Sequence, residues 1–198
     1  MERLDRDAAA VIVIDLQNDF CDPDGYQSRL GRDVAHTHEA ASAIVSFTEQ
    51  ARHLGVPIFL LRNVHDPATE TEEWHARHLE PRPGSSCAPG SWGAEFFRIE
   101  PAKSDRVVVK SRYSAFAKTS LERMLRELDR RALFFCGITT SVCVETSLRD
   151  AVCRDFVATL VNDCCADYSP AAHDGAVRAV SHGFGAVLNS DAVLAAWR

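Results

Sequence analysis

The sequence predicts an α/β fold, in which a doubly wound, six-stranded and mainly parallel sheet carries helices on both faces. Short, continuous apolar runs alternate along the chain with longer amphipathic stretches, and such runs are typical of strands that are buried on both faces. Strands that alternate with helices become parallel neighbours joined by right-handed crossovers. Since 198 residues suit one ordinary domain with a sizeable core, we expect a single domain over residues 1–198.

Six short apolar runs are the candidate strands. They occupy residues 9–14, 57–61, 106–109, 132–136, 156–161 and 186–188. Six such strands with helical crossovers give a Rossmann-like arrangement. Sheets of this kind bind their ligands at the carboxyl ends of the strands, so we look for a site there.

Four longer stretches are the candidate helices, at residues 36–54, 121–128, 142–153 and 170–182. The first places its apolar side chains on one face. Thr119 and Glu122 have the spacing of a capping box at the start of the second, and Ser169 precedes Pro170 as an N-cap of the fourth. Residues 63–101 break the alternation, and their many prolines and glycines predict a loop-rich lid.

The overall composition indicates a globular protein outside the membrane, with 46% apolar and 25% charged residues. A net charge of −6 without a run of lysine or arginine argues against a nucleic-acid partner. No stretch approaches the roughly 20 apolar residues that a bilayer requires, and residues 1–7 lack the apolar core of a signal peptide. We therefore expect a cytoplasmic protein that acts on a small molecule.

Seven cysteines occur, an odd number without the paired spacing of a zinc site. Most are expected to be small buried hydrophobic residues, and the adjacent Cys164 and Cys165 are expected to be free thiols. Cys143 is different, because it follows the strand at 132–136 where the next helix begins. A thiol at a helix N-terminus is expected to have a lowered pKa and to be nucleophilic near neutral pH.

Two other strand ends carry charged side chains, Asp15 after residues 9–14 and Lys110 after residues 106–109. Because the carboxyl ends of parallel strands meet at one edge of a sheet, one cleft can hold both together with Cys143. A thiolate can attack a carbonyl carbon, a carboxylate can move the proton to the leaving nitrogen, and an ammonium favours both anions. The trio predicts a cysteine hydrolase, although each residue alone has an ordinary structural explanation.

Three motifs carry a resemblance, over nearly the whole chain, to the isochorismatase-like cysteine hydrolase superfamily. They are Asp-Leu-Gln-Asn-Asp-Phe at 15–20, Lys-Ser-Arg-Tyr-Ser-Ala-Phe at 110–116 and Gly-Ile-Thr-Thr-Ser-Val-Cys-Val at 137–144. Each motif alone is weak, but their order and spacing together are specific. The resemblance implies that Asp15 is the proton shuttle, Lys110 the cation beside the thiol and Cys143 the nucleophile.

The resemblance also implies the parts of the site that surround the thiol. It implies a cis peptide bond between Ile138 and Thr139, and an oxyanion hole made by the backbone N–H groups of Thr139 and Cys143. Phe20 and Tyr113 flank the motifs, so they wall the pocket or only fill the core. Asn63 ends the second strand, where its amide could bind substrate or equally satisfy loop backbone.

Within the superfamily, the chain is similar to ureidoacrylate amidohydrolases and biuret hydrolases. The shared stretches are Arg-Tyr-Ser at 112–114 with Phe116, Cys-Val-Glu at 143–145, Leu-Arg-Asp at 148–150 and Gly-Tyr at 25–26. This similarity implies a carbamoyl, ureido or small amide substrate and a thioester intermediate. True isochorismatases commonly lack the thiol, so Cys143 favours hydrolysis of a C–N bond over cleavage of a vinyl ether.

A metal site is the feature that separates this chain from nicotinamidases of the superfamily, which hold a metal with an Asp-x-His pair and a further histidine. Here the pair reads Asn63-Val64-His65, with an amide in place of the acid. His75 and His78 follow at helical spacing and could ligate in principle. Without the carboxylate we expect no metal and no other cofactor.

Several alternatives stay open from sequence. The chain could be a nicotinamidase, another isochorismatase-like hydrolase, or a non-catalytic binding protein of the same fold. Arg112 could bind a substrate carboxylate or form a salt bridge, and Trp74 and Trp92 could line the cleft from the lid. The family resemblance implies a homo-oligomer, a dimer or tetramer, and Trp197 with the apolar residues 193–196 could pack against something. The histidines on helical patterns are expected to be exposed, namely His36, His38, His53, His173 and His182.

Overall fold

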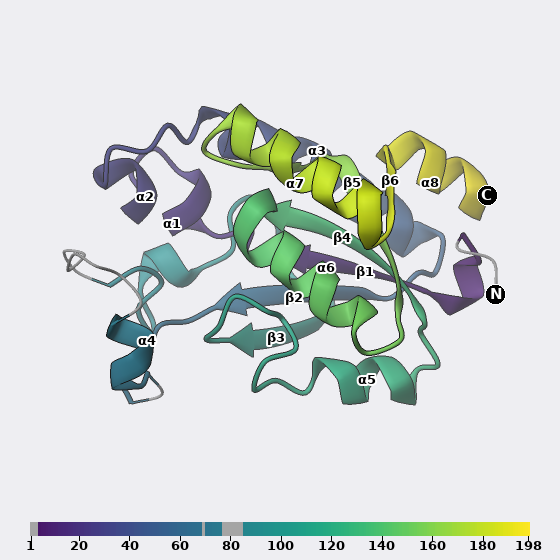
Figure 1. The fold of residues 1–198 in the computed structure, drawn as a ribbon, viewed down its shortest axis with the longest axis horizontal. Coiled ribbons are helices and arrows are strands. Elements are labelled where there is room, and N and C mark those ends of the chain that lie inside the picture. Colours follow the sequence, from purple (N-terminus) through teal and green to yellow (C-terminus); the bar gives the residue numbers. More distant parts are fainter. Residues whose placement is uncertain (1–3, 69, 77–84) are drawn as a thin grey trace.

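The computed structural model describes residues 4–68, 70–76 and 85–198. Within them, six strands form one sheet in the order β3-β2-β1-β4-β5-β6, and every neighbouring pair is parallel (Figure 1). The predicted doubly wound parallel sheet is therefore confirmed. The strands are β1 (Ala9–Ile14), β2 (Ile58–Asn63), β3 (Arg106–Lys110), β4 (Ala132–Ile138), β5 (Val157–Ala166) and β6 (Ala186–Leu188).

Four of the six predicted strands end too early. β2, β3, β4 and β5 each continue beyond the apolar run that predicts them, and β5 extends furthest, to Ala166. The ladder of backbone hydrogen bonds persists where the side chains turn polar: Asn63 and Lys110 are register partners at the ends of β2 and β3. Polar side chains are thereby held on the rigid sheet and not on a loop.

The four predicted helices are present, and further helical segments accompany them. α3 (Ala35–His53), α5 (Leu121–Glu127) and α7 (Pro170–Gly183) agree with the prediction to within one residue, whereas the nucleophile helix divides into a π-turn (Thr140–Val144) and α6 (Glu145–Val152). The sequence did not predict α1 (Asn18–Cys21), α2 (Tyr26–Arg29), α4 (Glu72–Ala76), α8 (Ser190–Trp197) and the 3-10 turns Arg6–Ala8 and Trp92–Ala94.

Of the two predicted helix caps, the one at Thr119 is displaced by one residue and the one at Ser169 is in the predicted position. Ser120, not Thr119, is the N-cap residue of α5, and the Glu122 carboxylate binds Arg126 and Arg154 instead of reaching back to the cap. Ser169 does occupy the N-cap position of α7, with Pro170 in the first turn, but its side chain makes no capping hydrogen bond. Thr119 still contributes locally, because its Oγ1 accepts from the Leu121 N–H at 3.3 Å.

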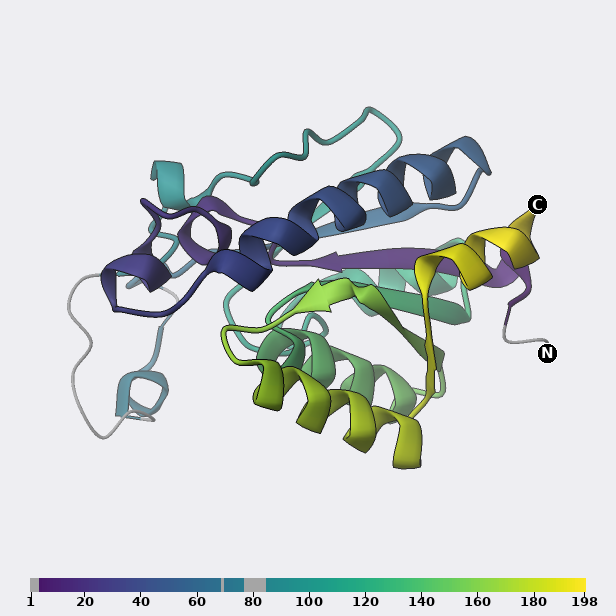
Figure 2. The same ribbon diagram turned by 90° about the horizontal axis from the view of Figure 1, so that it is seen from above.

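The sheet is covered on both faces (Figure 2). α3 and α8 lie on one face, and α6 and α7 lie on the other. The short helices α1, α2 and α4 gather beyond the carboxyl ends of the strands, whereas α8 lies near the opposite end of the sheet (Figure 1). The polar carboxyl ends of the strands therefore face the short helices.

The apolar C-terminal segment packs into the core of its own chain. Trp197 is 2% exposed and lies with its ring 4.6 Å from that of Phe134, edge to face, and 6.0 Å from that of Phe47. Val193 and Leu194 are buried beside it. This segment needs no second subunit to cover it, so it gives no support to the predicted oligomer.

None of the helices in the described parts of the chain has the length and apolar character that crossing a bilayer requires.

Candidate active site

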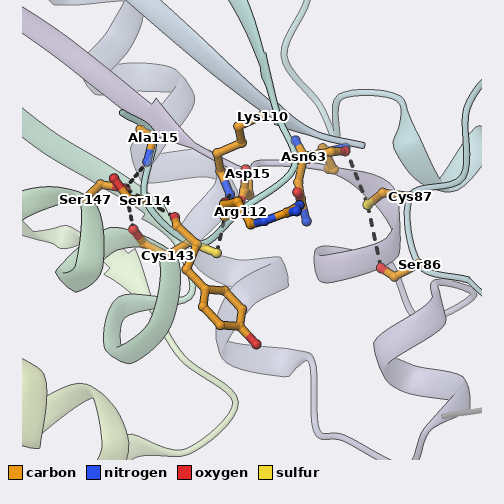
Figure 3. Close-up of polar contacts among 12 residues, drawn as sticks. Asp15, Asn63, Ser86, Cys87, Lys110, Arg112, Ser114, Ala115, Cys143 and Ser147 are labelled. Atoms are coloured by element: carbon orange, nitrogen blue, oxygen red, sulfur yellow. Dashed lines mark hydrogen bonds and ion pairs between the residues drawn. The ribbon is translucent and has the colours of Figure 1, made fainter. Parts of the chain in front are cut away.

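Asp15, Lys110 and Cys143 meet at the carboxyl ends of the strands. The Lys110 Nζ lies 2.7 Å from Asp15 Oδ2 and 3.5 Å from Cys143 Sγ, and the Asp15 carboxyl group also contacts the thiol. All three side chains are buried, with Cys143 keeping 8% of its surface exposed. Figure 3 shows Asp15 and Lys110 between Cys143 and Asn63. The sequence prediction that one place holds all three is confirmed.

The end of β1 turns sharply to deliver Asp15. Its φ is 49°, a left-handed backbone that aspartate tolerates better than most residues. The Asp15 N–H donates to Leu61 O at 3.1 Å, and the Gln17 N–H donates back to Asp15 O at 2.8 Å. The neighbouring strand β4 carries Gly137, whose φ is 120° and where a Cβ would lie 2.1 Å from Ile14 O. Only glycine lets β4 pass so close to the strand that presents Asp15.

The turn that carries Cys143 begins with the expected cis peptide bond between Ile138 and Thr139. Thr139 is the N-cap residue of the π-turn, and its carbonyl accepts from the N–H groups of Val142 and Val144, both at 3.2 Å. π-Turns are frequent at functional sites. The N–H groups of Thr139 and Cys143 belong to this turn, as the proposed oxyanion hole requires.

Two side chains bind the π-turn: Asp167, which follows β5, and His173 on α7. Asp167 Oδ2 accepts from the Ser141 N–H at 2.8 Å and from Ser141 Oγ at 2.7 Å. His173 Nδ1 lies 2.9 Å from Thr140 Oγ1, and its Nε2 lies 3.2 Å from Asn162 Oδ1. The expectation that His173 is exposed is therefore wrong, because its ring bridges the turn to β5.

Ser147 connects the nucleophile to the motif that follows Lys110. Its Oγ donates to Cys143 O at 2.6 Å and accepts from the buried Ala115 N–H at 2.9 Å. Nearby, Ser114 Oγ donates to Asp150 Oδ2 at 2.5 Å. Two segments far apart in sequence are thus joined by the hydroxyl groups of Ser147 on α6 and of Ser114 in the motif after Lys110.

The thiol pKa is not lowered as the sequence predicted. Burial raises the pKa of Cys143 to about 12, against the opposing effect of the Lys110 charge. Desolvation is the largest influence on this pKa, and it acts against the thiolate. A base beside the thiol becomes necessary for nucleophilic attack.

Asp15 has the properties of that base. Burial raises the pKa of its carboxyl group, and the charge of Lys110 acts in the opposite direction. Burial alone would lower the pKa of Lys110, but its contacts with Asp15 and Cys143 outweigh this and raise it. Lys110 is therefore a permanent cation, and Asp15 has a proton affinity above that of an ordinary carboxylate.

Asn63 lies next to Lys110, with its backbone held by a residue that the sequence reading passed over. Gln17 Oε1 accepts from the Asn63 N–H at 2.7 Å, and Gln17 Nε2 donates to Asn63 O and to Ala94 O, both at 2.9 Å. Asn63 is 6% exposed, so its amide is a fixed, buried group. Gln17 belongs to the first family motif, at residues 15–20, but the motif does not show that its side chain holds the Asn63 backbone.

His65 has both ring nitrogens engaged. Its Nδ1 lies 2.5 Å from Glu70 Oε1, and its Nε2 lies 3.0 Å from Asn63 Nδ2. Among the described residues, no group of three or more His, Cys, Asp or Glu side chains has the geometry of a metal site. His78 and the side chain of His75, which the sequence left open as ligands, lie outside what the structure describes.

An aromatic cluster of Trp74 and Tyr113 lies beside the motif that follows Lys110. The two rings are 4.9 Å apart, and the guanidinium of Arg112 lies 4.5 Å from the centre of the Trp74 ring. Arg112 also donates to Ser111 O at 2.7 Å, and it forms no ion pair within the described residues. Phe20 is half-buried against the core, whereas Trp92 is 52% exposed.

All seven cysteines are free, as predicted for Cys164 and Cys165. Six of them are buried, and Cys153 is exposed at the end of α6. Among the buried six, Cys143 is the thiol that contacts both a carboxylate and an ammonium. Burial alone therefore does not mark the candidate nucleophile; its two charged neighbours do.

Comparison with known proteins places these motifs in a family. The isochorismatase domain matches residues 9–192 of the chain. A ureidoacrylate amidohydrolase RutB from Methylorubrum extorquens is 33% identical, over 97% of this chain and 84% of the relative. Another RutB, from Azorhizobium caulinodans, is 34% identical over 78% of this chain and 74% of the relative.

Solved structures share the fold. A cysteine hydrolase from Pseudomonas syringae pv. phaseolicola 1448A superposes with a TM-score of 0.85 and 25% identity, covering 100% of this chain and 94% of that one. The nicotinamidase PncA from Bacillus subtilis gives a TM-score of 0.79 and 26% identity, covering 92% of this chain and 99% of that one.

Proposed function

This chain belongs to the isochorismatase family of hydrolases, and we propose that it is a cysteine-dependent amidohydrolase that cleaves a C–N bond in a small carbamoyl, ureido or amide compound. The observation that carries the proposal is the position of Lys110 Nζ, 2.7 Å from Asp15 and 3.5 Å from Cys143. A buried thiol needs both a base and a stabilising cation to react, and these contacts supply both.

The first half of the reaction forms a covalent intermediate. Asp15 accepts the proton of the Cys143 thiol, and Sγ attacks the carbonyl carbon while the carbonyl oxygen becomes an oxyanion. The N–H groups of Thr139 and Cys143 bind that oxyanion, a contribution commonly worth about 3 kcal/mol per donor. Asp15 then gives its proton to the leaving nitrogen, the C–N bond breaks, and ammonia or an amine departs from the thioester.

The second half restores the enzyme. Water attacks the thioester carbonyl carbon, and Asp15 accepts a proton from that water. The tetrahedral intermediate collapses with release of Sγ, which regains its proton from Asp15. Lys110 keeps its charge throughout and stabilises the thiolate and the carboxylate in turn. The atoms balance as one water consumed for one C–N bond hydrolysed.

Three side chains are proposed to contact the substrate. Asn63 is buried beside Lys110 and offers an amide. Tyr113, whose ring is tilted against that of Trp74, and Phe20 from α1 supply apolar walls. Relatives named ureidoacrylate amidohydrolase support a ureido substrate for this chain, and the carbamoyl group of such a compound offers the N–H and carbonyl groups that these contacts would bind.

Ammonia release from a panel of compounds tests the proposal. The panel contains ureidoacrylate analogues, biuret, N-carbamoyl amino acids, simple aliphatic amides and nicotinamide. We expect turnover of one or more ureido or carbamoyl compounds and loss of that turnover in Cys143→Ala. Failure to release ammonia from any of them, together with a Cys143 that resists alkylation in the folded protein, would favour a binding protein.

Nicotinamidase activity is the competing function, supported by the structural likeness to the nicotinamidase from Bacillus subtilis. The two functions differ in their need for a metal. We expect ammonia release to persist after treatment with a chelator. Hydrolysis of nicotinamide in preference to the ureido compounds, abolished by chelator and restored by a divalent metal, would replace our proposal.

A further inference from the structure

Three side chains form a continuous line from the segment before α4 to the candidate active site. Glu70 Oε1 lies 2.5 Å from His65 Nδ1, and His65 Nε2 lies 3.0 Å from Asn63 Nδ2. The His65 and Glu70 side chains are 17% and 9% exposed. The line therefore runs largely out of contact with water, where hydrogen bonds are directional and strong.

The chemistry of the three groups fixes the direction of every hydrogen bond in the line. A carboxylate only accepts, so Nδ1 of His65 carries the proton that is donated to Glu70. In a neutral imidazole the other nitrogen, Nε2, is then an acceptor, and it accepts from the amide NH2 of Asn63. The Asn63 amide consequently has one orientation, with its NH2 toward His65 and its Oδ1 facing away.

Among the residues that the structure describes, none donates a hydrogen bond to the oxygen of that amide. Asn63 is 6% exposed, and within the described parts of the chain its Oδ1 is a buried acceptor without a partner. The backbone on both sides of the amide is held by Gln17, and Asn63 pairs in register with Lys110. A buried oxygen that is held rigidly beside a catalytic group and lacks a donor is arranged to receive one from a ligand.

We propose that Glu70 and His65 are positioning residues that orient the Asn63 amide, so that Oδ1 accepts a hydrogen bond from an N–H group of the substrate. This inference rests on the proposed function and refines it: the site recognises a nitrogen that bears hydrogen in the carbamoyl or amide group. The opposite tautomer of His65 would turn the amide around and offer an NH2 group instead. The tautomer thus sets which substrates the site accepts.

A comparison of amide and ester substrates tests the inference. Glu70→Gln removes the carboxylate that selects the tautomer, and Glu72→Gln, an exposed carboxylate in the next helix, is the matched control. We expect kcat/KM for the preferred ureido compound to fall about three- to tenfold in Glu70→Gln, the worth of one neutral hydrogen bond, chiefly through KM. Hydrolysis of p-nitrophenyl acetate, an ester without an N–H group, should change less than about twofold.

A double-mutant cycle shows whether Glu70 acts through Asn63. Asn63→Leu should cause the same selective loss, and Glu70→Gln should add nothing in the Asn63→Leu background. Glu70→Asp, which keeps the carboxylate, should recover part of the activity. An equal fall for amide and ester, or additive losses in the cycle, would overturn the inference.

A measurement without substrate separates this inference from the proposed function. In protein labelled with 15N-histidine, with His65→Asn used to assign the signals, we expect the neutral tautomer that is protonated on Nδ1, and its loss in Glu70→Gln. If the wild type is active but carries the His65 proton on Nε2, or on both nitrogens, the inference about Glu70 and His65 is refuted and the proposed function is not. If the wild type has the expected tautomer but hydrolyses no amide, the proposed function is refuted and the orientation of Asn63 by His65 is not.

Discussion

Lys110 reaches past the end of an intervening strand to bind Asp15. Their strands, β3 and β1, are not neighbours, since β2 lies between them. The two side chains nevertheless form an ion pair of 2.7 Å in which both members are almost wholly buried. The ion pair thus links the ends of β1 and β3 across the end of β2, beside the candidate nucleophile.

Removing one member of this ion pair should be costly for folding and for catalysis. Lys110→Met leaves a buried carboxylate without its cation, so we expect the free energy of unfolding to fall by about 3–5 kcal/mol. The double variant Asp15→Asn, Lys110→Met should be more stable than Lys110→Met alone, because no charge is left unpaired. Urea denaturation checks both, and a double variant no more stable than the single one would contradict the explanation.

Gly137 should tolerate no side chain. A Cβ there would lie 2.1 Å from Ile14 O, and the backbone has a φ of 120°. We expect Gly137→Ala to be insoluble or to unfold with far lower stability. Gly175→Ala is the matched control, because Gly175 lies in α7 with its nearest neighbouring atom at 4.0 Å. That change should stabilise the protein by about 0.5–1 kcal/mol. Equal effects of the two substitutions would show that the close approach of β4 to β1 is unimportant.

Alkaline pH should destabilise the protein through its buried thiols. Burial raises the pKa of Cys143 and of Cys164 to about 12 from the ordinary 9.0, and it raises the pKa of Cys136 as well. The unfolded thiols therefore ionise first, so stability is full below pH 9 and is lost as the pH rises through the folded pKa. Each such thiol should contribute a slope of about −1.4 kcal/mol per pH unit above pH 9.

Two variants check the origin of that slope. Urea denaturation between pH 8 and pH 11 should give a slope that is shallower by about 1.4 kcal/mol per pH unit in Cys136→Ala. Cys153→Ser changes an exposed cysteine and should leave the slope as it is. A slope that is the same in all three proteins would refute this assignment.

Ser147 should matter for both stability and turnover. Ser147→Ala leaves the buried Ala115 N–H without its acceptor and frees the Cys143 carbonyl, which we expect to cost about 1–3 kcal/mol of unfolding free energy. The nucleophile turn loosens as a result, so kcat should fall with little change in KM. Ser181→Ala, at an exposed position on α7, serves as the control. An unchanged kcat would show that Ser147 has a structural role only.

The sheet and the reactive trio could be predicted because their signals are local in sequence. Each strand contains a short apolar run. Asp15 directly follows β1, Lys110 is the last residue of β3, and Cys143 lies in the turn after β4. The short helices could not be predicted, since four or five residues are too few to show a helical period. The strand ends were missed for a related reason: the ladder continues where the apolar pattern has stopped.

The thiol pKa was predicted with the wrong sign, because local sequence reports a helix N-terminus but not burial. Burial of Cys143 comes from elements distant in the chain, and it is the largest influence on that pKa. The partners Gln17, Glu70 and His173 were missed for the same reason. Each acts through a side chain brought to the site by a turn or a crossover, and none has a spacing that sequence alone reveals.

The claim that Cys143 is the nucleophile is tested most directly by a search for the covalent intermediate. The wild type is mixed with the ureido compound that it hydrolyses best, quenched in acid and examined by mass spectrometry of the peptide that contains Cys143. We expect this peptide to gain the mass of the carbamoyl or acyl group, and we expect Cys143→Ala to show neither this gain nor ammonia release. Undiminished ammonia release by Cys143→Ala would contradict the account.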